Sequence, residues 1–462
     1  MATGAFDSTP SSSSLRGLVD RDAIGALVLA AALPLLFLHE RFQPALEVSA
    51  GSTSLDVRPS DAAVLAVYAA ALVAASRKGL SILGPSRLLW VSGGLLLAWL
   101  AFQAFRPASL NDARFDDHLV AFGKFVEYAL LAICVPLLVR RARDLALLTW
   151  SVVLWSLAAT AVAIVQLLGF DVFRVSSSGW RYSSFLGRHD LAALSAISLS
   201  FALAGVVAGR GRLPAPNLFW LGLAAGAVGL VLAGSVAAAG SLAVGAVALA
   251  LAAVRRFRPS RRQIAALAAI VVAVGAGVTI ARSAALEDFL RFVGLHGDEP
   301  AQGVETYSQR TVLAYIGLRI FEDNPVVGVG WQRSSRPDVF EPYVDDARRR
   351  FPGVVGPAFP AEGREWGVQN LYIQMLADAG VIGLALLLFV GVAGLALAWR
   401  AAARAPTPWA AGAGLLVVCG LLTVAGEWAS DGIVAGIPLQ AATCLLLGLA
   451  AAGAAAVENG PR

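Results

Sequence analysis

The sequence predicts an all-α polytopic membrane protein with about twelve transmembrane helices and one large loop that contains short helices. The first observation is composition: mean hydropathy is +0.71 and only 15% of the 462 residues are charged, whereas soluble domains carry roughly 25%. The second is that apolar residues form long runs. The third is that arginines concentrate in alternate short connections, as expected of a chain that crosses a membrane repeatedly. Each span is expected to be helical, because unpaired backbone groups find no water in lipid.

Twelve apolar runs are long enough to cross a hydrocarbon core of roughly 30 Å. The second run is short, and only a tight turn separates the seventh from the eighth, so eleven or thirteen spans are alternatives. In chain order the runs cover residues 23–38, 62–75, 88–105, 119–139, 145–169, 191–208, 218–233, 237–254, 264–281, 381–399, 410–425 and 432–454.

The runs divide the chain into four parts. Residues 1–22, rich in serine, are expected to form a cytoplasmic tail. Residues 23–281 hold the first nine spans, and residues 282–379 form a large extracytoplasmic loop. Residues 380–462 hold the last three spans and a cytoplasmic C-terminus.

Arginine and lysine predict the orientation, because short connections that carry them stay on the cytoplasmic side. We therefore expect both termini in the cytoplasm and the large loop on the outer side. That loop carries ten arginines of its own, but long translocated loops escape the rule. The cations of the predicted cytoplasmic connections are Arg77, Lys78, Arg87, Arg140, Arg141, Arg143, Arg210, Arg212, Arg255, Arg256, Arg258, Arg261, Arg262, Arg400 and Arg404.

Several functional classes have little support in the composition. The three cysteines, Cys134, Cys419 and Cys444, all fall in apolar runs, which predicts neither a disulfide framework nor a cysteine metal site. The net charge of +5 is explained by membrane topology and not by nucleic-acid binding. We expect no metal, no cofactor and no nucleic-acid partner.

The large loop is expected to contain a helix, an irregular stretch and a second helix. Apolar residues recur at helical spacing from Val312 to Ile320 and stop before Pro325, so Arg310 lies in the first turn of a helix. Glycines and prolines predict irregular chain over residues 326–360. A second helix is expected from near Trp366.

Three arginines of the predicted outer loops are candidate anion ligands: Arg181, Arg188 and Arg310. The planar guanidinium matches phosphate oxygens with two parallel hydrogen bonds and keeps its charge, which suits a lipid diphosphate at the membrane surface. The alternative for each arginine is pairing with an acid of the same loops, such as Asp171 or Asp190.

One pair of opposite charges lies inside a predicted span. Lys124 and Glu127 are three residues apart in the fourth apolar run. Intramembrane charges usually face a cavity or one another. A structural ion pair is one interpretation, and contact with the head group of a lipid-linked donor is the other.

Three polar motifs border the apolar runs in this part of the chain. They are Arg181-Tyr182-Ser183-Ser184-Phe185-Leu186-Gly187, then Ser308-Gln309-Arg310 with Asp323-Asn324-Pro325-Val326-Val327-Gly328-Val329-Gly330 after it, and Gln369-Asn370-Leu371-Tyr372-Ile373-Gln374. Taken in this order, the motifs resemble those of the O-antigen ligase and O-antigen polymerase family, over roughly residues 180–388.

The resemblance implies a metal-independent, inverting glycosyltransferase with a GT-C-like architecture in the bacterial plasma membrane. It would act at the outer face on a glycan carried by undecaprenyl diphosphate. The family's arginines hold the donor diphosphate, and Arg181 and Arg310 match those positions. The implied partners are the undecaprenyl-diphosphate-linked glycan, membrane lipid and other polysaccharide-assembly membrane proteins.

The sequence departs from the family pattern in two places. Ligases carry a histidine beside the position of Asn370, proposed to activate the acceptor hydroxyl, and this chain has Gln369 there. At the tight turn, Val236 follows Ser235 where many relatives have Ser-Arg. The first departure favours a polymerase of lipid-linked repeat units. A ligase that transfers the glycan to lipid A core or another acceptor is the alternative.

The catalytic candidates are Glu365, Gln369 and Asn370. Glu365 is the nearest carboxylate if a base is needed, since a base must lie within hydrogen-bond reach of the acceptor hydroxyl. His189 and Tyr372 are secondary candidates. For His189 the competing interpretation is a polar cap at the lipid boundary.

A transporter of lipid-linked oligosaccharide is the alternative from another functional class. Transporters are expected to show related halves and broken, charged helices near the bilayer midplane. The sequence shows no convincing internal repeat, and its polar residues concentrate in the predicted outer loops. A non-catalytic scaffold explains neither the motifs nor their order, so we expect an enzyme.

Overall fold

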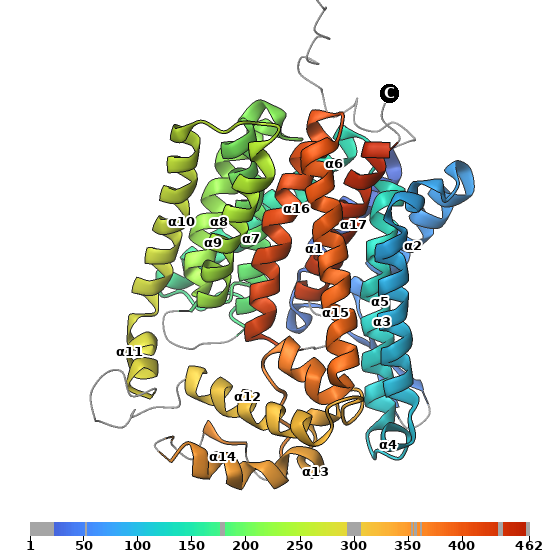
Figure 1. Ribbon diagram of the computed structural model, residues 1–462, viewed down its shortest axis with the longest axis vertical. Helices are drawn as coiled ribbons and strands as arrows, with labels where there is room; N and C mark the ends of the chain where they lie inside the picture. The colour runs from blue at the N-terminus through green and yellow to red at the C-terminus, as the bar shows by residue number, and fades with distance from the viewer. Residues whose placement is uncertain are drawn as a thin grey trace, which may run out of the picture.

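The computed structural model is a bundle of long helices with shorter helices of the large loop across one end (Figure 1). The predicted class, an all-α polytopic membrane protein, is confirmed. The predicted tail, residues 1–22, lies outside the described residues. The structure describes residues 23–50, 53–175, 181–292, 306–352, 354, 358–360, 363–432 and 438–458.

Eleven helices of the described chain are long and apolar enough to cross a membrane. The first predicted span corresponds to α1 (Ile24–Leu36), which has only 13 residues. The long helices are α2 (Pro59–Lys78), α3 (Arg87–Phe105), α5 (Phe115–Leu138), α6 (Ala142–Leu167), α7 (Arg188–Ala208), α8 (Phe219–Ala233), α9 (Val236–Val254), α10 (Arg261–Ala281), α15 (Leu371–Arg404), α16 (Pro408–Glu427) and α17 (Pro438–Glu458).

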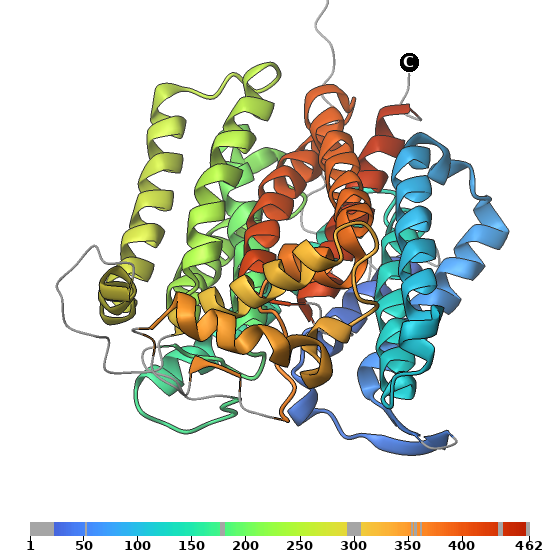
Figure 2. The same cartoon turned by 60° about the horizontal axis from the view of Figure 1, so that its bottom comes forward.

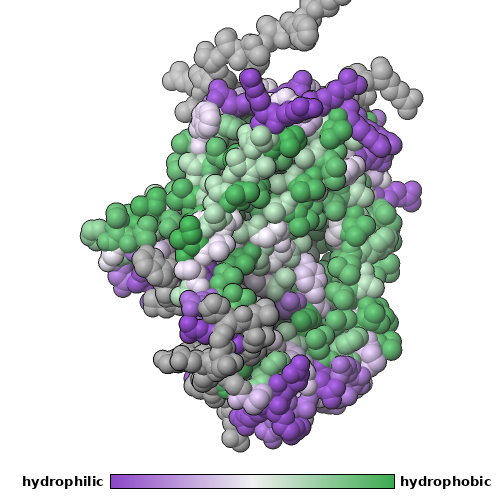
Figure 3. Space-filling view, turned by 60° about the vertical axis from the view of Figure 1, so that its left-hand side comes forward, coloured by the Kyte–Doolittle hydropathy of each residue, from purple (hydrophilic) through white to green (hydrophobic). Residues whose placement is uncertain are grey.

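The surface has the pattern of a protein that crosses lipid. Figure 3 shows a broad band of hydrophobic side chains between two hydrophilic ends. Peripheral helices expose large apolar residues in this band, such as Leu72 on α2 and Val272 and Ile280 on α10. Such exposure would be costly in water and is favourable in a bilayer.

Three helices occupy the centre of the bundle. In the most apolar 18-residue stretch of each helix, 89% of the residues are buried in α7 and 78% in both α16 and α17. In α10 only 17% are buried. Small residues allow the central contacts: a Cβ on Gly226 of α8 would stand 2.6 Å from the backbone nitrogen of Leu199 on α7. Close backbone approach of this kind is how helices associate in lipid. The first turn of α7 and the last turn of α16 therefore meet at the middle of one end.

The arginine-rich connections gather at the end opposite the large loop (Figure 1). There Arg256, after α9, donates to the carbonyl of Ala405, after α15, and Arg400 pairs with Glu458 at 2.9 Å. This is the alternation that the sequence predicted. Which end faces the cytoplasm stays a prediction.

The large loop folds into short helices that lie across the end of the bundle (Figure 2). They are α11 (Ser283–Phe292), α12 (Thr306–Asp323), α13 (Pro337–Phe340) and α14 (Val344–Arg350), with 3-10 turns η7 (Arg333–Ser335) and η8 (Glu341–Tyr343). The prediction of irregular chain over 326–360 is wrong for residues 333–350. Pro337 and Pro342 open helical turns instead of breaking them, and Phe340 packs with the apolar face of α12.

The second loop helix begins later than predicted. Helix α15 starts at Leu371 and not near Trp366, because Asn370 caps it. The Asn370 Oδ1 accepts the backbone N–H groups of Tyr372 and Ile373 at 3.0 and 3.1 Å, the usual geometry of an N-cap.

Helix α15 is broken at Gly380, whose φ is +67°. The break leaves carbonyls without partners in their own helix, and the large loop supplies the donors. The N–H groups of Val329 and Gly330 donate to Ala377 and Asp378 at 2.8 and 2.9 Å, and Val381 donates to Pro325 at 2.9 Å. The loop is thus hydrogen-bonded into a transmembrane helix, which satisfies backbone groups that lipid could not.

One hairpin was not predicted. Strands β1 (Leu46–Ala50) and β2 (Thr53–Val57) pair antiparallel between α1 and α2. The remaining short elements are η3 (Glu40–Phe42), η4 (Ser81–Ser86), α4 (Pro107–Leu110), η5 (Arg210–Arg212), η6 (Pro216–Leu218) and η10 (Trp428–Ser430).

Candidate functional site

A polar cavity of about 900 Å³ lies where the bundle meets the large loop. Its size falls within the range of ligand-binding sites, roughly 300–1,000 Å³. A smaller cavity of about 30 Å³ adjoins it, because Arg310 lines both. Parts of the chain that are far apart in sequence line the larger cavity: they lie within residues 36–43, 56–61, 117–128, 188–190, 310, 332–335, 365–374, 431–432 and 438.

Arg310 joins the third sequence motif to the chain that directly follows the first motif. It is the fifth residue of α12, at the start of the second turn and not in the first as predicted. Its Nε donates to the Gln369 Oε1 at 3.0 Å. Its Nη2 lies 3.1 Å from the Nε2 of His189, at the start of α7. Arg319, nine residues further along α12, contacts Glu322 and Asp346 instead. The two arginines therefore serve different surfaces.

His189 stands between Arg310 and a buried carboxylate. Its Nδ1 lies 3.2 Å from the Oε2 of Glu427, whose side chain is fully buried. The hydroxyl of Ser235 donates to the other oxygen of Glu427. Glu427 was not a candidate in the sequence. The available signal was an acid at the end of an apolar run, on the same side as the large loop.

Arg181 is buried beside further positive charges. Its Nε donates to the carbonyl of Ala233 at 3.1 Å. Burial lowers the pKa of its guanidinium to about 9, and nearby cations act in the same direction. These cations are Arg188, Arg282 and Arg310.

Arg282 is a site residue that the sequence analysis missed. It follows the last residue of α10 and is 9% exposed. With Arg181 and Arg310 it lines the smaller cavity, beside the turn at Gly234 and Ser235. The signal was an arginine directly after an apolar span at the start of the large loop. Cations gathered this closely repel one another, so the arrangement favours an anion between them.

Two acidic residues lie beside this cluster of arginines and reduce its net positive charge. Glu427 contacts His189, and Asp431 lines the larger cavity nearby. Burial raises the pKa of Asp431, although the charge of Arg310 and the backbone N–H of Gly432 oppose the shift. The cluster therefore has one strongly cationic side, formed by the arginines, and one side with buried carboxylates.

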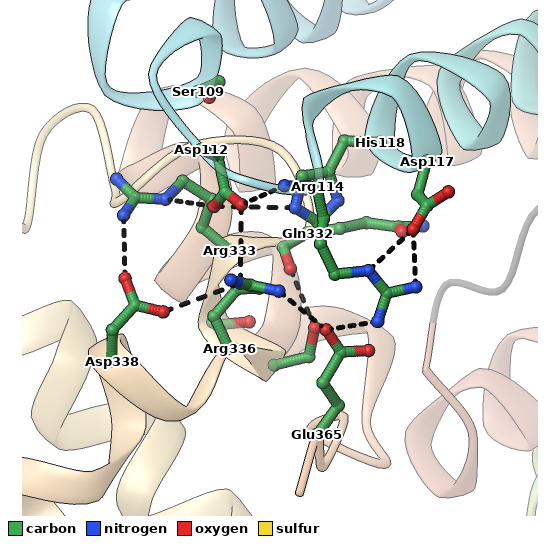
Figure 4. Close-up of polar contacts among 12 residues, drawn as sticks. Ser109, Asp112, Arg114, Asp117, His118, Gln332, Arg333, Arg336, Asp338 and Glu365 are labelled. Carbon is green, nitrogen blue, oxygen red and sulfur yellow. Dashed lines mark hydrogen bonds and ion pairs between the residues drawn. The ribbon is translucent and has the colours of Figure 1, made fainter. Parts of the chain in front are cut away.

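Glu365 occupies a different network (Figure 4). Its Oε1 lies 2.7 Å from Arg114 and 3.0 Å from Arg336. Arg333 and Arg336 both contact Asp112, whose side chain is 1% exposed. This network joins the chain between α4 and α5 to the large loop. Glu365 also borders the cavity, and its role as a base stays a prediction.

Asn370 and Tyr372 hold α15 against the end of α16. The Asn370 Nδ2 donates to the carbonyl of Ala429 at 2.9 Å, and the Tyr372 hydroxyl donates to Ala425 at 2.7 Å. These contacts place Gln369, the next residue along, beside Arg310. A direct part for Asn370 and Tyr372 in catalysis stays a prediction.

The intramembrane pair has a third member. Lys124 lies 3.2 Å from Glu127 and also binds Asp61 in the first turn of α2. Asp61 fell just before the predicted second span and was not identified as a partner. Lys124 and Asp61 both border the larger cavity, so the ion pair and the contact with substrate are compatible.

Comparison with known proteins finds one family for part of the chain. The sequence model of the family described as O-antigen ligase matches residues 221–388, which contain Arg282, Arg310 and Gln369. The matched range begins after Arg181 and His189, which the structure brings to the same place. No curated protein matches the chain by sequence. The resemblance seen in the motifs is confirmed over this range: residues 221–388 of this membrane protein match the O-antigen ligase family.

Proposed function

We propose that the protein polymerises undecaprenyl-diphosphate-linked oligosaccharide repeat units, as an inverting and metal-independent glycosyltransferase. The observation that carries this proposal is the convergence of Arg181, Arg282 and Arg310 on one cavity at the end of the bundle. Guanidinium groups in this arrangement bind the diphosphate of the donor. They also stabilise the negative charge that grows on the diphosphate as it leaves.

The two cavities fit the two chemical parts of the donor, the diphosphate and the sugars. The diphosphate binds where the two cavities meet at Arg310, beside the other arginines of the smaller one. The larger one, lined by carboxylates, amides and hydroxyls, receives sugars, whose hydroxyls need many hydrogen-bond partners. Placing both substrates in line supplies a large part of the rate enhancement.

The site lies at the end opposite the arginine-rich connections (Figure 1). These connections favour the cytoplasmic side, so the site faces outward and both termini lie inside. Undecaprenyl-linked units presented at the outer face of the plasma membrane then reach it directly. Residues 1–22 form a cytoplasmic tail in this arrangement.

Gln369 favours a polymerase over a ligase that uses lipid A core. Its amide oxygen accepts from Arg310, in the place where ligases of the family carry a histidine. Gln369 therefore holds a donor-binding arginine and has no basic nitrogen to offer an acceptor. The ligase is the second candidate.

The test uses the purified full chain in lipid nanodiscs with undecaprenyl-diphosphate repeat units. A polymerase produces a ladder of lengthening glycans, and a ligase produces a single transfer to an added acceptor. Arg181→Ala and Arg310→Ala are expected to abolish transfer while the proteins stay folded. Arg319→Ala is the matched control, because Arg319 lies on α12 away from the cavity. Normal ladders from both cavity variants would contradict the proposal.

A further inference from the structure

We propose that His189 is the general base that accepts the proton of the acceptor hydroxyl, that Glu427 positions it, and that Arg310 covers it until donor binds. The inference rests on the proposed glycosyl transfer and names the group that activates the acceptor. It assigns this task to the first turn of α7, outside the range matched by the family model.

The contacts fix the tautomer of His189. A guanidinium has only N–H donors, so the His189 Nε2, 3.1 Å from the Arg310 Nη2, must accept. Its proton is then on Nδ1, which donates to Glu427 at 3.2 Å. In this tautomer the lone pair of Nε2 is directed at Arg310, the group that binds donor. This is the orientation that a base requires.

Glu427 is built to hold the ring and not to react itself. Its side chain is fully buried, and the Ser235 hydroxyl occupies its second oxygen. A carboxylate behind Nδ1–H orients the imidazole and stabilises the imidazolium that forms when Nε2 takes a proton. Its position at the end of α16, in the centre of the bundle, makes this orientation rigid.

His189 is better placed for this task than the other candidates at the cavity. Glu365 has one oxygen held by two arginines of the network described above. His189 instead contacts Arg310 directly, so its Nε2 lies beside the place where the donor diphosphate binds. The acceptor hydroxyl must approach the anomeric carbon next to that diphosphate.

Arg310 links donor binding to activation of the base. In the structure its guanidinium covers Nε2. When the guanidinium turns to the donor phosphate, the lone pair of Nε2 becomes available. The acceptor oxygen then forms a bond to the anomeric carbon, and the bond from that carbon to the diphosphate oxygen breaks. The bonding electrons leave with the diphosphate, and the hydroxyl proton passes to Nε2.

The first experiment replaces the base with a side chain that keeps the hydrogen bond. In His189→Gln the amide oxygen still accepts from Arg310 but takes no proton. We expect kcat for glycan transfer to fall by about 10²- to 10⁴-fold, the usual contribution of a general base, with binding of undecaprenyl diphosphate within a few-fold of wild type. His118→Gln is the matched control, because His118 also lies near a carboxylate, Asp112, but outside the arginine cluster. We expect its kcat to stay within tenfold of wild type.

Two outcomes would overturn the assignment alone: a His189→Gln protein whose kcat is within tenfold of wild type, or one that loses donor binding as much as it loses turnover. A wild-type protein that transfers no glycan would overturn the proposed function itself, and the base with it. The comparison of wild type with variant therefore separates the two failures.

The second experiment tests the positioning role of Glu427 through a pH profile. The charged groups that interact with the ring are Arg310, Glu427 and Asp431. On its own helix the charged neighbours in sequence are Arg188 and Asp190. Glu427→Gln removes the negative charge that stabilises imidazolium, so the acid limb of kcat should move to lower pH. A role limited to packing would lower the amount of folded protein and leave the midpoint of this limb unchanged, which would overturn the positioning role.

Discussion

The guanidinium of Arg310 donates to the amide oxygen of Gln369 across 3.0 Å, although the two residues are 59 positions apart. The contact joins two parts of the large loop, since Arg310 lies in α12 and Gln369 lies just before α15. It also gives Arg310, which we propose binds the donor, a neutral partner. A neutral partner can be exchanged for a phosphate more easily than a charged one, because hydrogen bonds between ions are stronger.

Gln369→Glu is expected to form an ion pair with Arg310. The new carboxylate would compete with the donor diphosphate for the same guanidinium. Hydrogen bonds that involve charged groups contribute about 1.5–3 kcal/mol, so KM for donor should rise by about tenfold or more. Steady-state kinetics with varied donor measure this. Gln369→Asn is the control for loss of length, and a KM unchanged in Gln369→Glu would contradict the role of Gln369 as a replaceable partner.

Arg282→Ala is expected to weaken donor binding without unfolding the protein. The change removes one of the three arginines that line the smaller cavity. The loss of one charged hydrogen-bonding group predicts a rise in donor KM of about 10- to 100-fold. Arg291→Ala is the matched control: Arg291 lies on α11, nine positions on, and pairs with Glu287. An equal donor KM for the two variants would show that Arg282 does not take part in donor binding.

Gly380→Ala is expected to destabilise the protein. The backbone of Gly380 has φ +67°, and a Cβ there would stand 2.1 Å from the carbonyl oxygen of Val326. Alanine at such a position costs more than about 1 kcal/mol. Thermal unfolding in detergent measures the loss. Gly391→Ala, on the same helix with open space around it, should be neutral or slightly stabilising, and a similar loss from both would rule out strain at the break.

The network at Asp112 is expected to loosen in acid. Burial opposes ionisation of Asp112, but the backbone N–H of Arg114 and the charges of Arg336, His118 and Arg333 outweigh it and lower its pKa. A lowered pKa adds stability above the unfolded value of about 3.9, and this stability is lost as the pH falls through the folded value. The large loop should therefore open below about pH 4.

Hydrogen exchange across α13 and α14 between pH 6 and pH 3 measures this opening. Asp112→Asn should remove the pH dependence and show faster exchange at every pH. Asp338→Asn serves as the control, because Asp338 pairs with the same arginines but is 56% exposed. A wild-type loop that exchanges equally at both ends of the range would speak against the network.

The membrane spans could be predicted because few backbone conformations satisfy all hydrogen bonds in lipid. A long apolar run must form a helix, and its position follows from the run itself. The loop was harder, because a proline can break a helix or begin one. Pro337 does the latter, and only its packing partners decide between the two. The hairpin was missed for a similar reason, since five-residue alternations are weak signals beside long apolar runs.

The site was predictable in its residue types and not in its partners. Arg181, Arg310 and Gln369 stood out because polar residues are conspicuous beside apolar spans. Glu427 and Arg282 did not, because their importance depends on which helix ends meet at the centre of the bundle. That arrangement is tertiary, and no local pattern encodes it.

The break at Gly380 makes the large loop and the start of α15 one cooperative unit. The carbonyls of Ala377 and Asp378 accept hydrogen bonds from the loop, so unfolding of the loop would remove partners from the start of α15. Such units open together in native proteins. We therefore expect the amide hydrogens of residues 371–379 to exchange with solvent at rates similar to those of the loop. Those of residues 381–404 should exchange at rates similar to those of the bundle. The two segments of this one transmembrane helix would then differ in their local free energy of unfolding.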